Sequence, residues 1–396
     1  MNPPSDDIVP TLNRFDGAPM LGGVTERWFR PALVVLLFLS GFGALGAQMA
    51  WTKLFANGLG HELPAVLAVV AAVMGGMAAG AGALDGRLAR GRSPGLWYAA
   101  LEGVIALWGC ASVLVIPLVN DAARQLIGAD APALSHWVLA FALPFLALLP
   151  ATAAMGATLP AMDRWLAPLW RDRRCLGALY AANTLGAVTG AWVGAFVALP
   201  VLGLTRSVAL FAQANLLCGV LAWLLATRPS GPRNTDAPNS GQAESNTGAQ
   251  GHLAAPACNE LSARRINGTI FLTGLLALGM ETLGVRLLSQ VLENTVYTYA
   301  VTLAVFLGAT ALGAASYQRW WRGRPARAWL AKGLAATSVA CALGAWVLTG
   351  AHEIYRACRG GWVGGVAGGI AAETVTAAAV VGPAAVLMDL TMPVLS

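Results

Sequence analysis

The sequence predicts an all-α, multi-pass membrane protein of about ten transmembrane helices in two related halves. Three observations support this fold class: the composition, the length of the apolar segments and an internal repeat. Of 396 residues, 57% are hydrophobic and 11% are charged. Soluble domains usually carry about 25% charged residues, so this chain has too little charge to cover a water-facing surface. Its 46 glycines suit closely packed membrane helices.

The apolar segments are long enough to cross a bilayer. About 20 helical residues span ~30 Å of hydrocarbon. Ten segments meet this length: 31–56, 63–84, 95–119, 135–160, 175–199, 204–227, 266–291, 297–317, 327–350 and 367–395. The first is too long for a cleavable signal peptide, and it follows a polar, turn-rich N-terminal segment, 1–30. Helix breaks are expected near Pro150 and Pro383.

The positive charges predict the orientation. Most of the 25 lysines and arginines lie in the N-terminal segment and in the loops that follow even-numbered spans. Four arginines lie on the opposite side: Arg124, Arg206, Arg356 and Arg359. By the positive-inside rule, both termini are expected in the cytoplasm, with the protein in the inner membrane. Because the charge is spread over several loops, it does not predict a nucleic-acid surface.

The chain divides into two halves joined by a linker. Residues 228–265 contain few aromatic or branched apolar residues, so they predict a flexible cytoplasmic linker. The first half, 31–227, contains six predicted spans. The second half, 266–396, contains four.

The two halves match at an offset of 233 residues. Residues 38–41 (FLSG) match 271–274 (FLTG), and the same offset relates 150–160 to 383–393. Six predicted spans separate the copies, so the repeats have the same orientation, as in major-facilitator transporters. The repeat leads us to expect two further spans after Pro393. Either the protein is a native ten-helix form, or the chain is cut short or encoded in pieces.

Three segments resemble the membrane region of spermidine synthase-like membrane proteins. They are FLSGFGALGAQMAWTKL (38–54), LLPATAAMGATLPAM (148–162) and LYAANTLGAVTGAWVGAFVALPVLGL (179–204). The resemblance implies a major-facilitator-like region that works with a soluble aminopropyltransferase-like domain. This chain shows no Gly-rich nucleotide loop after a strand, so the enzyme activity does not carry over. The family's first span typically has Glu and Arg where this chain has Gln48 and Lys53, whereas the second copy has Glu281 and Arg286.

Six polar residues inside predicted spans are candidates for binding a solute. Charge inside a bilayer is costly, so such residues mark a polar site or a structural pair. The candidates are Glu281, Arg286, Gln48, Lys53, Glu102 and Asn183. The alternative for Lys53 and Arg286 is that their side chains reach the outer membrane surface. For Glu281 the alternative is a structural ion pair, and for Asn183 a hydrogen bond between helices.

Other patterns predict packing and exclude several chemistries. Gly186, Gly190 and Gly194 form one small face of a helix, which predicts close helix packing. The sequence shows no catalytic triad, no metal motif and no cofactor motif, and its six cysteines form no C-x-x-C pair.

We therefore expect a membrane module that binds or moves a small solute, with an amine or cation as one possibility. Its expected partners are the lipid bilayer and a separately encoded aminopropyltransferase-like subunit carrying the missing helices. A stand-alone secondary transporter is the first alternative, and a membrane-embedded enzyme is the second.

Overall fold

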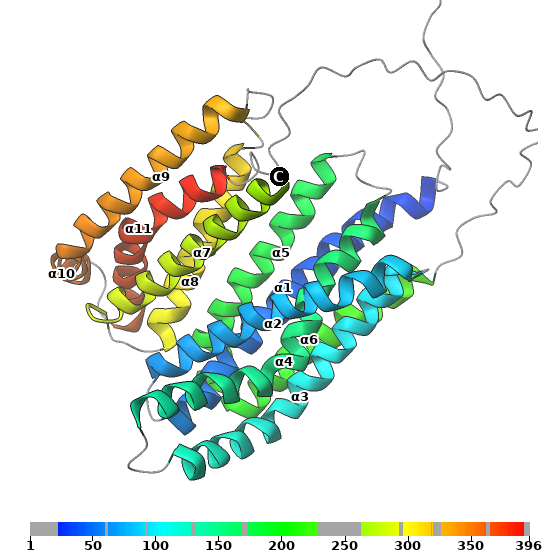
Figure 1. Ribbon diagram of the computed structural model, residues 1–396, viewed down its shortest axis with the longest axis horizontal. Coiled ribbons are helices and arrows are strands. Elements are labelled where there is room, and N and C mark those ends of the chain that lie inside the picture. The colour runs from blue at the N-terminus through cyan, green and yellow to red at the C-terminus, as the bar shows by residue number, and fades with distance from the viewer. Residues whose placement is uncertain are drawn as a thin grey trace, which may run out of the picture.

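The chain folds into a helical bundle in the computed structural model (Figure 1), which describes residues 23–59, 62–91, 93–127, 132–167, 173–227, 263–292, 296–317, 319, 326–361 and 365–391. These residues contain no β-strand. Their helices are α1 (Gly23–Leu59), α2 (Glu62–Arg90), α3 (Pro94–Ile127), α4 (Ala133–Leu166), α5 (Arg173–Val193), the π-helix η2 (Gly194–Ala198), α6 (Leu199–Ala226), α7 (Ala263–Leu288), α8 (Val296–Ser316), α9 (Ala326–Thr349), α10 (Ala351–Gly361) and α11 (Val366–Thr391).

The lengths and composition of these helices are those of a multi-pass membrane protein. Eight helical stretches among the described residues are long and apolar enough to cross a bilayer. They are Pro31–Gly58, Pro64–Arg90, Pro94–Leu126, Leu134–Leu166, Leu179–Ala226, Val296–Ser316, Ala331–Thr349 and Ala367–Leu390. Helix α7 coincides with the predicted seventh span, but it is not among these eight. The count of ten spans therefore stays a prediction.

The longest of these stretches, Leu179–Ala226, is interrupted at one glycine. Its 48 residues would extend ~70 Å as one helix, more than twice the thickness of the hydrocarbon. Gly203 has φ 75° and ψ 175°, a conformation that residues with a side chain rarely adopt. The predicted fifth and sixth spans lie on either side of this glycine, and α5 and α6 both pack against α1.

In the first half, α1 to α6, the helices surround a continuous core. Helix α1 packs against α5, α6, α2 and α3, and α4 packs against α2 and α3. The largest fully buried side chains of this half include Trp51, Tyr98, Phe55 and Phe211. The Trp51 indole Nε1 donates a hydrogen bond to Ser112 Oγ at 2.9 Å, which links α1 to α3. A buried indole N–H needs a hydrogen-bond partner, and here Ser112 supplies it.

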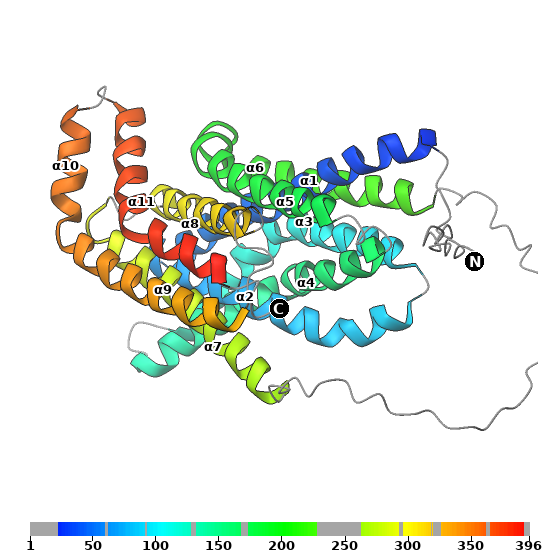
Figure 2. The same cartoon turned by 90° about the horizontal axis from the view of Figure 1, so that it is seen from above.

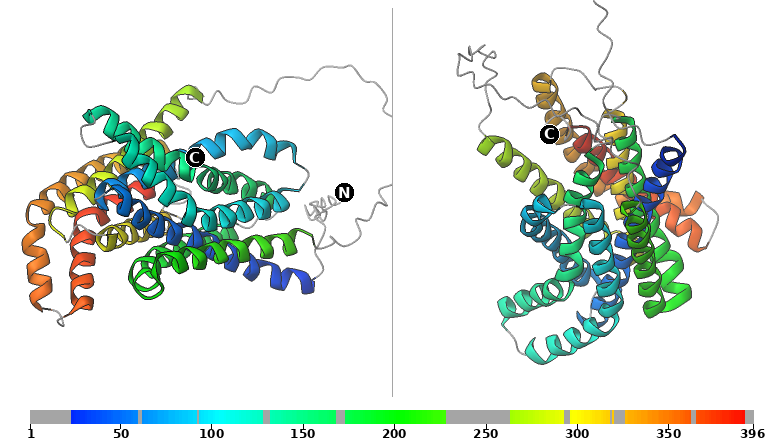
Figure 3. Two further views of the ribbon diagram at one scale, coloured as in Figure 1. Left: turned by 90° about the horizontal axis from the view of Figure 1, so that it is seen from below. Right: turned by 90° about the vertical axis from the view of Figure 1, so that its right-hand side faces the viewer.

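In the second half, α7 to α11, helix α11 packs against both α8 and α9. Figure 2 shows α9, α10 and α11 at one end of the molecule, and the left panel of Figure 3 shows the same arrangement from below. Pro383 lies inside α11, which stays helical through it and bends (Figure 2). Helix α4 likewise stays helical through Pro150. The sequence did not predict α10.

Parts of the predicted organisation lie outside the described residues. Of the predicted linker, 228–265, residues 228–262 are outside the described residues, as are residues 1–22 of the predicted N-terminal segment. Residues 263–265 belong to α7 and residues 23–30 to α1, so both helices begin earlier than predicted. The predicted division at this linker is compatible with the helix order, because α6 ends at Ala226 and α7 begins at Ala263.

Candidate functional site

The two halves meet where α8 packs against α5, α1 and α2. A cluster of buried residues spans this interface: Met49, Val66, Val70, Ala191, Ala195, Val285, Tyr299, Ala300 and Leu303. At its centre, Gln48 Nε2 donates a hydrogen bond to the Tyr299 hydroxyl oxygen at 2.7 Å. Both side chains are buried, with exposed fractions of 4% and 2%. A polar pair inside an apolar interface makes this the best candidate for a binding site in the described residues.

A carboxyl group lies within electrostatic range of this hydrogen bond. Glu281 of α7 is close enough to Tyr299 to interact with it electrostatically. Gln48 and Glu281 occupy equivalent positions in the two predicted repeats, separated by 233 residues. Of the predicted site residues, Gln48 therefore bonds to Tyr299, and Glu281 of the other half lies within electrostatic range of it.

Aromatic rings continue the interface beside this polar group. Phe196 and Tyr297 are stacked, with ring centroids 5.4 Å apart, and Trp192 packs on Phe196. Phe196 belongs to the π-helix η2, where the backbone departs from α-helical spacing. Such π-turns often occur at functional sites. Here the π-turn lies where α5 meets α8, so Phe196 joins the two halves.

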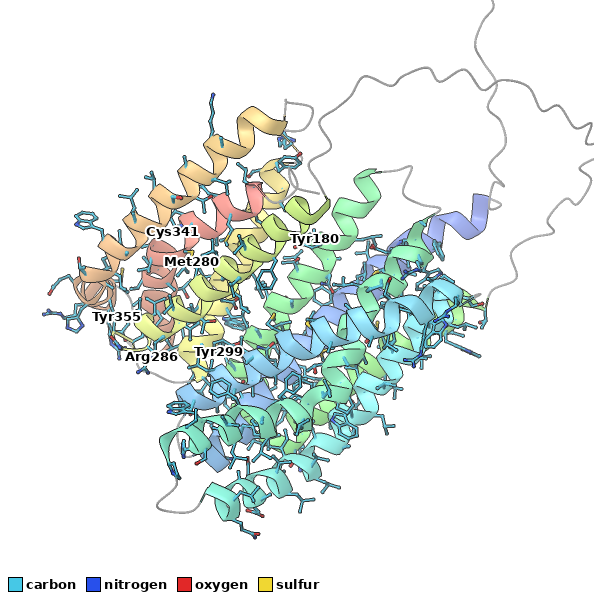
Figure 4. All side chains as sticks on the ribbon, in the orientation of Figure 1. Tyr180, Met280, Arg286, Tyr299, Cys341 and Tyr355 are labelled. Atoms are coloured by element: carbon cyan, nitrogen blue, oxygen red, sulfur yellow. The ribbon has the colours of Figure 1, made fainter. Side chains whose placement is uncertain are left out.

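Lys53 and Arg286, the other equivalent pair, do not join the Tyr299 group. Lys53 forms an ion pair with Glu62, at the start of α2, and both side chains are partly exposed. The second carboxyl oxygen of Glu62 accepts a hydrogen bond from the backbone N–H of Val296 at 2.6 Å. Glu62 thereby links α1 and α2 to the first residue of α8. Arg286 is exposed near the end of α7, whereas Tyr299 lies among the interface helices (Figure 4).

Glu102 lies in a separate polar group inside the first half. Its side chain is 0% exposed, and Ser40 Oγ donates a hydrogen bond to its Oε1 at 2.6 Å. Tyr98 and Cys218 also face this carboxyl group. The structure therefore places Glu102 between α3, α1 and α6, away from the contact between the halves.

Asn183 and the predicted glycine face lie where α5 packs on α1. A side chain added at Gly186 would overlap the carbonyl oxygen of Phe38, and one added at Gly190 would overlap that of Phe42. At Gly194 the nearest atom would be Met49 Cβ at 3.3 Å. Asn183 is half-buried, and its backbone carbonyl lies against Gly41. These glycines therefore let two helix backbones approach closely.

Several residues of these groups were not predicted from the sequence. Tyr299, Phe196 and Ser40 were missed because a tyrosine, a phenylalanine or a serine in an apolar span is usually unremarkable. One signal was present for Tyr299: the segment Tyr297-Thr298-Tyr299 is polar for the start of a span. Nothing local pointed to Phe196, because a π-turn has no clear sequence pattern.

Comparison with known proteins adds no constraint to these observations. No protein-family model matches the chain, and no curated protein or solved structure matches it.

Proposed function

We propose that this protein is a membrane carrier that binds a small organic cation, of the amine class, between its two halves. The observation that carries the proposal is the Gln48–Tyr299 hydrogen bond, which joins the halves within electrostatic range of Glu281. A carboxyl group next to aromatic rings suits an ammonium group, since it offers both charge pairing and cation–π contact. The resemblance of segments 38–54, 148–162 and 179–204 to spermidine synthase-like membrane proteins supports the same solute class.

The proposal includes a major-facilitator-like arrangement of two parallel repeats. Shifted by 233 residues, the first residues of α2, α3 and α4 fall within one residue of the first residues of α8, α9 and α11. The helix pairs also pack alike, because α4 packs on α2 and α3, and α11 packs on α8 and α9. In transporters built from such repeats, the solute binds at the repeat interface.

A close backbone contact is common to both proposed repeats. A side chain added at Gly80 of α2 would overlap the carbonyl of Ala153 in α4. One added at Gly313 of α8 would overlap the carbonyl of Val386 in α11. Gly313 and Val386 are the residues that the offset of 233 assigns to Gly80 and Ala153. This agreement in residue pairing supports the repeat independently of the sequence match.

Binding of spermidine or putrescine to the purified protein tests the solute site. We expect Glu281→Gln to weaken binding by about tenfold or more, which corresponds to ~1.4 kcal/mol. Glu353→Gln is the matched control, because Glu353 is exposed and pairs with Arg356 on α10. Calorimetry in detergent micelles measures both variants. Equal affinity of the wild type and Glu281→Gln, or no binding of either amine, would contradict the proposed site.

The same proposal places the protein in the inner membrane with both termini in the cytoplasm. An alkaline phosphatase reporter near Asp130 should be active, and one in the 228–262 segment should be inactive. The reverse pattern would exclude this orientation. An aminopropyltransferase-like partner is the prediction that follows from the resemblance, and co-purification from the native membrane tests it.

A further inference from the structure

Glu102 is a carboxyl group with one oxygen satisfied and the other not. Oε1 accepts the hydrogen bond from Ser40, whereas Oε2 has no hydrogen-bond partner among the described residues. The Cβ of Glu102 lies against Gly219 of α6, so the side chain fills the space between three helices. Full burial of an unpaired carboxyl oxygen is rare in folded proteins and requires a physical explanation.

Among the residues that the structure describes, no positive charge pairs with Glu102. The titratable groups that face it are Tyr98 of its own helix and Cys218 of α6, and α1 contributes the hydroxyl of Ser40. The Tyr98 oxygen and Cys218 Sγ are 3.8 Å apart, and Cys218 donates to the carbonyl of Leu36 at 3.3 Å. Tyrosine and cysteine ordinarily carry no charge at neutral pH.

An isolated carboxylate in such an interior is too costly to persist. Transfer of a lone ionised carboxylate into a medium of low dielectric constant costs so much that the group binds a proton instead. A protonated carboxyl group remains polar, but it needs no counter-ion. The packing of Glu102 among neutral groups is therefore the packing expected for its protonated form.

A second buried oxygen without a partner lies one helical turn away. Asn215 Oδ1 is buried and has no hydrogen-bond partner among the described residues. Asn215 precedes Cys218 by three residues on α6, and it lies against Gly43, three residues after Ser40 on α1. Two unsatisfied oxygens in neighbouring turns provide polar partners for water when the helices separate.

We propose that Glu102 is a proton-binding site, loaded in the packed state and emptied when α1 moves away from α3. In that movement the Ser40 hydrogen bond breaks, water enters, and the carboxyl O–H gives its proton to water and leaves a hydrated carboxylate. Reprotonation and closure reverse the step. This site is distinct from the Tyr299 group, and the contacts that support it do not involve that group.

Helix α1 connects this proton site to the solute site. Ser40 and Gln48 are on the same helix, about 12 Å apart along its axis. A rigid movement of α1 therefore changes the Glu102 and Tyr299 hydrogen bonds together, which is the structural requirement for coupling two sites. The coupling rests on the proposed solute site, whereas proton binding does not.

Infrared spectroscopy of protein reconstituted in lipid vesicles tests proton binding without any solute. At neutral pH we expect a protonated carboxyl C=O band in the wild type that disappears in Glu102→Gln and persists in Glu353→Gln. If Glu102→Gln fails to fold, Ser40→Ala serves instead, because it keeps the carboxyl group and removes its hydrogen bond. That variant should shift the band to higher frequency. A band unchanged in Glu102→Gln, or unshifted in Ser40→Ala, would overturn the proton site.

Spermidine added to vesicles that contain a pH-sensitive dye tests the coupling. We expect spermidine to drive proton movement in the wild type, and Glu102→Gln to lose that movement while it still binds spermidine. Proton movement that survives in Glu102→Gln would overturn the coupling. A protein that binds no spermidine but keeps the Glu102 infrared band would contradict the solute site alone.

Discussion

The first half of the molecule is closely packed around α1, whereas α7, the helix that the predicted repeat pairs with α1, is largely exposed among the described residues. Gly41 and Gly46 of α1 face Asn183 of α5 and Phe211 of α6 so closely that a side chain at either glycine would overlap them. The equivalent glycines of α7, Gly274 and Gly279, have no atom within 4 Å of an added Cβ among the described residues.

Exposed residues on the surface of α7 show the same difference. Six large apolar side chains of this helix are exposed: Phe271, Leu272, Leu275, Leu276, Leu283 and Leu287. A membrane supplies an apolar solvent, so such a surface carries no hydrophobic penalty. Two helices with related sequence patterns thus differ in packing: α1 is a packed centre in one half, and α7 is a peripheral helix in the other. Their neighbours decide this difference.

The largest expected effect tests this difference directly. Gly41→Leu should destabilise the protein by about 3 kcal/mol, because the new side chain would force α5 away from α1. Gly274→Leu, the equivalent change in α7, should change stability by less than about 0.5 kcal/mol. Unfolding in increasing SDS measures both variants. Similar losses of stability in the two would show that α7 is as tightly packed as α1.

A smaller effect tests where the two halves are alike. Gly80→Ala and Gly313→Ala should each cost about 1–2 kcal/mol, since each methyl group meets a backbone carbonyl that cannot move without its helix. The same unfolding measurement applies, with Gly82→Ala as the control, because an added Cβ there meets nothing within 4 Å. If Gly80→Ala lowers stability and Gly313→Ala does not, the α8–α11 contact is packed less closely than the α2–α4 contact.

The hydrogen bond between the halves should contribute less than either packing contact. A double-mutant cycle of Gln48→Leu and Tyr299→Phe should give a coupling of about 0.6 kcal/mol, the average for buried hydrogen bonds between membrane helices. Trp51→Phe with Ser112→Ala, within the first half, gives the reference value for a bond of similar burial. Zero coupling between Gln48 and Tyr299 would mean that the bond does not stabilise the interface.

The ion pair at the edge of the interface should have the smallest effect. Lys53→Gln should lower stability by no more than about 0.5 kcal/mol, because both partners are partly exposed and water screens them. Addition of salt should reduce the difference between this variant and the wild type. A loss that is large and insensitive to salt would indicate that Glu62 needs Lys53 in order to hold Val296.

Much of the helical arrangement could be predicted from the sequence, because a chain in lipid must satisfy its backbone hydrogen bonds within helices. Spans such as 63–84, 95–119 and 135–160 lie inside α2, α3 and α4. The predicted span 327–350 ends where α9 ends, but helix α10 was missed, because its residues 351–361 are too polar and too few to form a span.

The candidate site was predictable only in part. Gln48, Glu281 and Glu102 could be selected because polar side chains are rare in spans. Which of them meet could not be predicted, since contacts between helices depend on helix rotation, and apolar helices give little periodicity from which to derive it. The charge of Lys53 was the one distinguishing signal, because it offered an alternative at the outer membrane surface; Lys53 is partly exposed, five residues after the buried Gln48.

The π-turn at Gly194–Ala198 also predicts where this chain can lose a single residue without misplacing the helix that follows. A residue deleted elsewhere in α5 would rotate everything after it by about 100° relative to everything before, which would misplace one side of the helix. A π-turn already holds one residue more than an α-helix of the same rise. Deletion of one residue within Gly194–Ala198 would restore α-helical spacing and leave both flanks facing as they do now. We therefore expect single-residue gaps to be tolerated here more readily than elsewhere in α5, at the expense of the Phe196–Tyr297 contact.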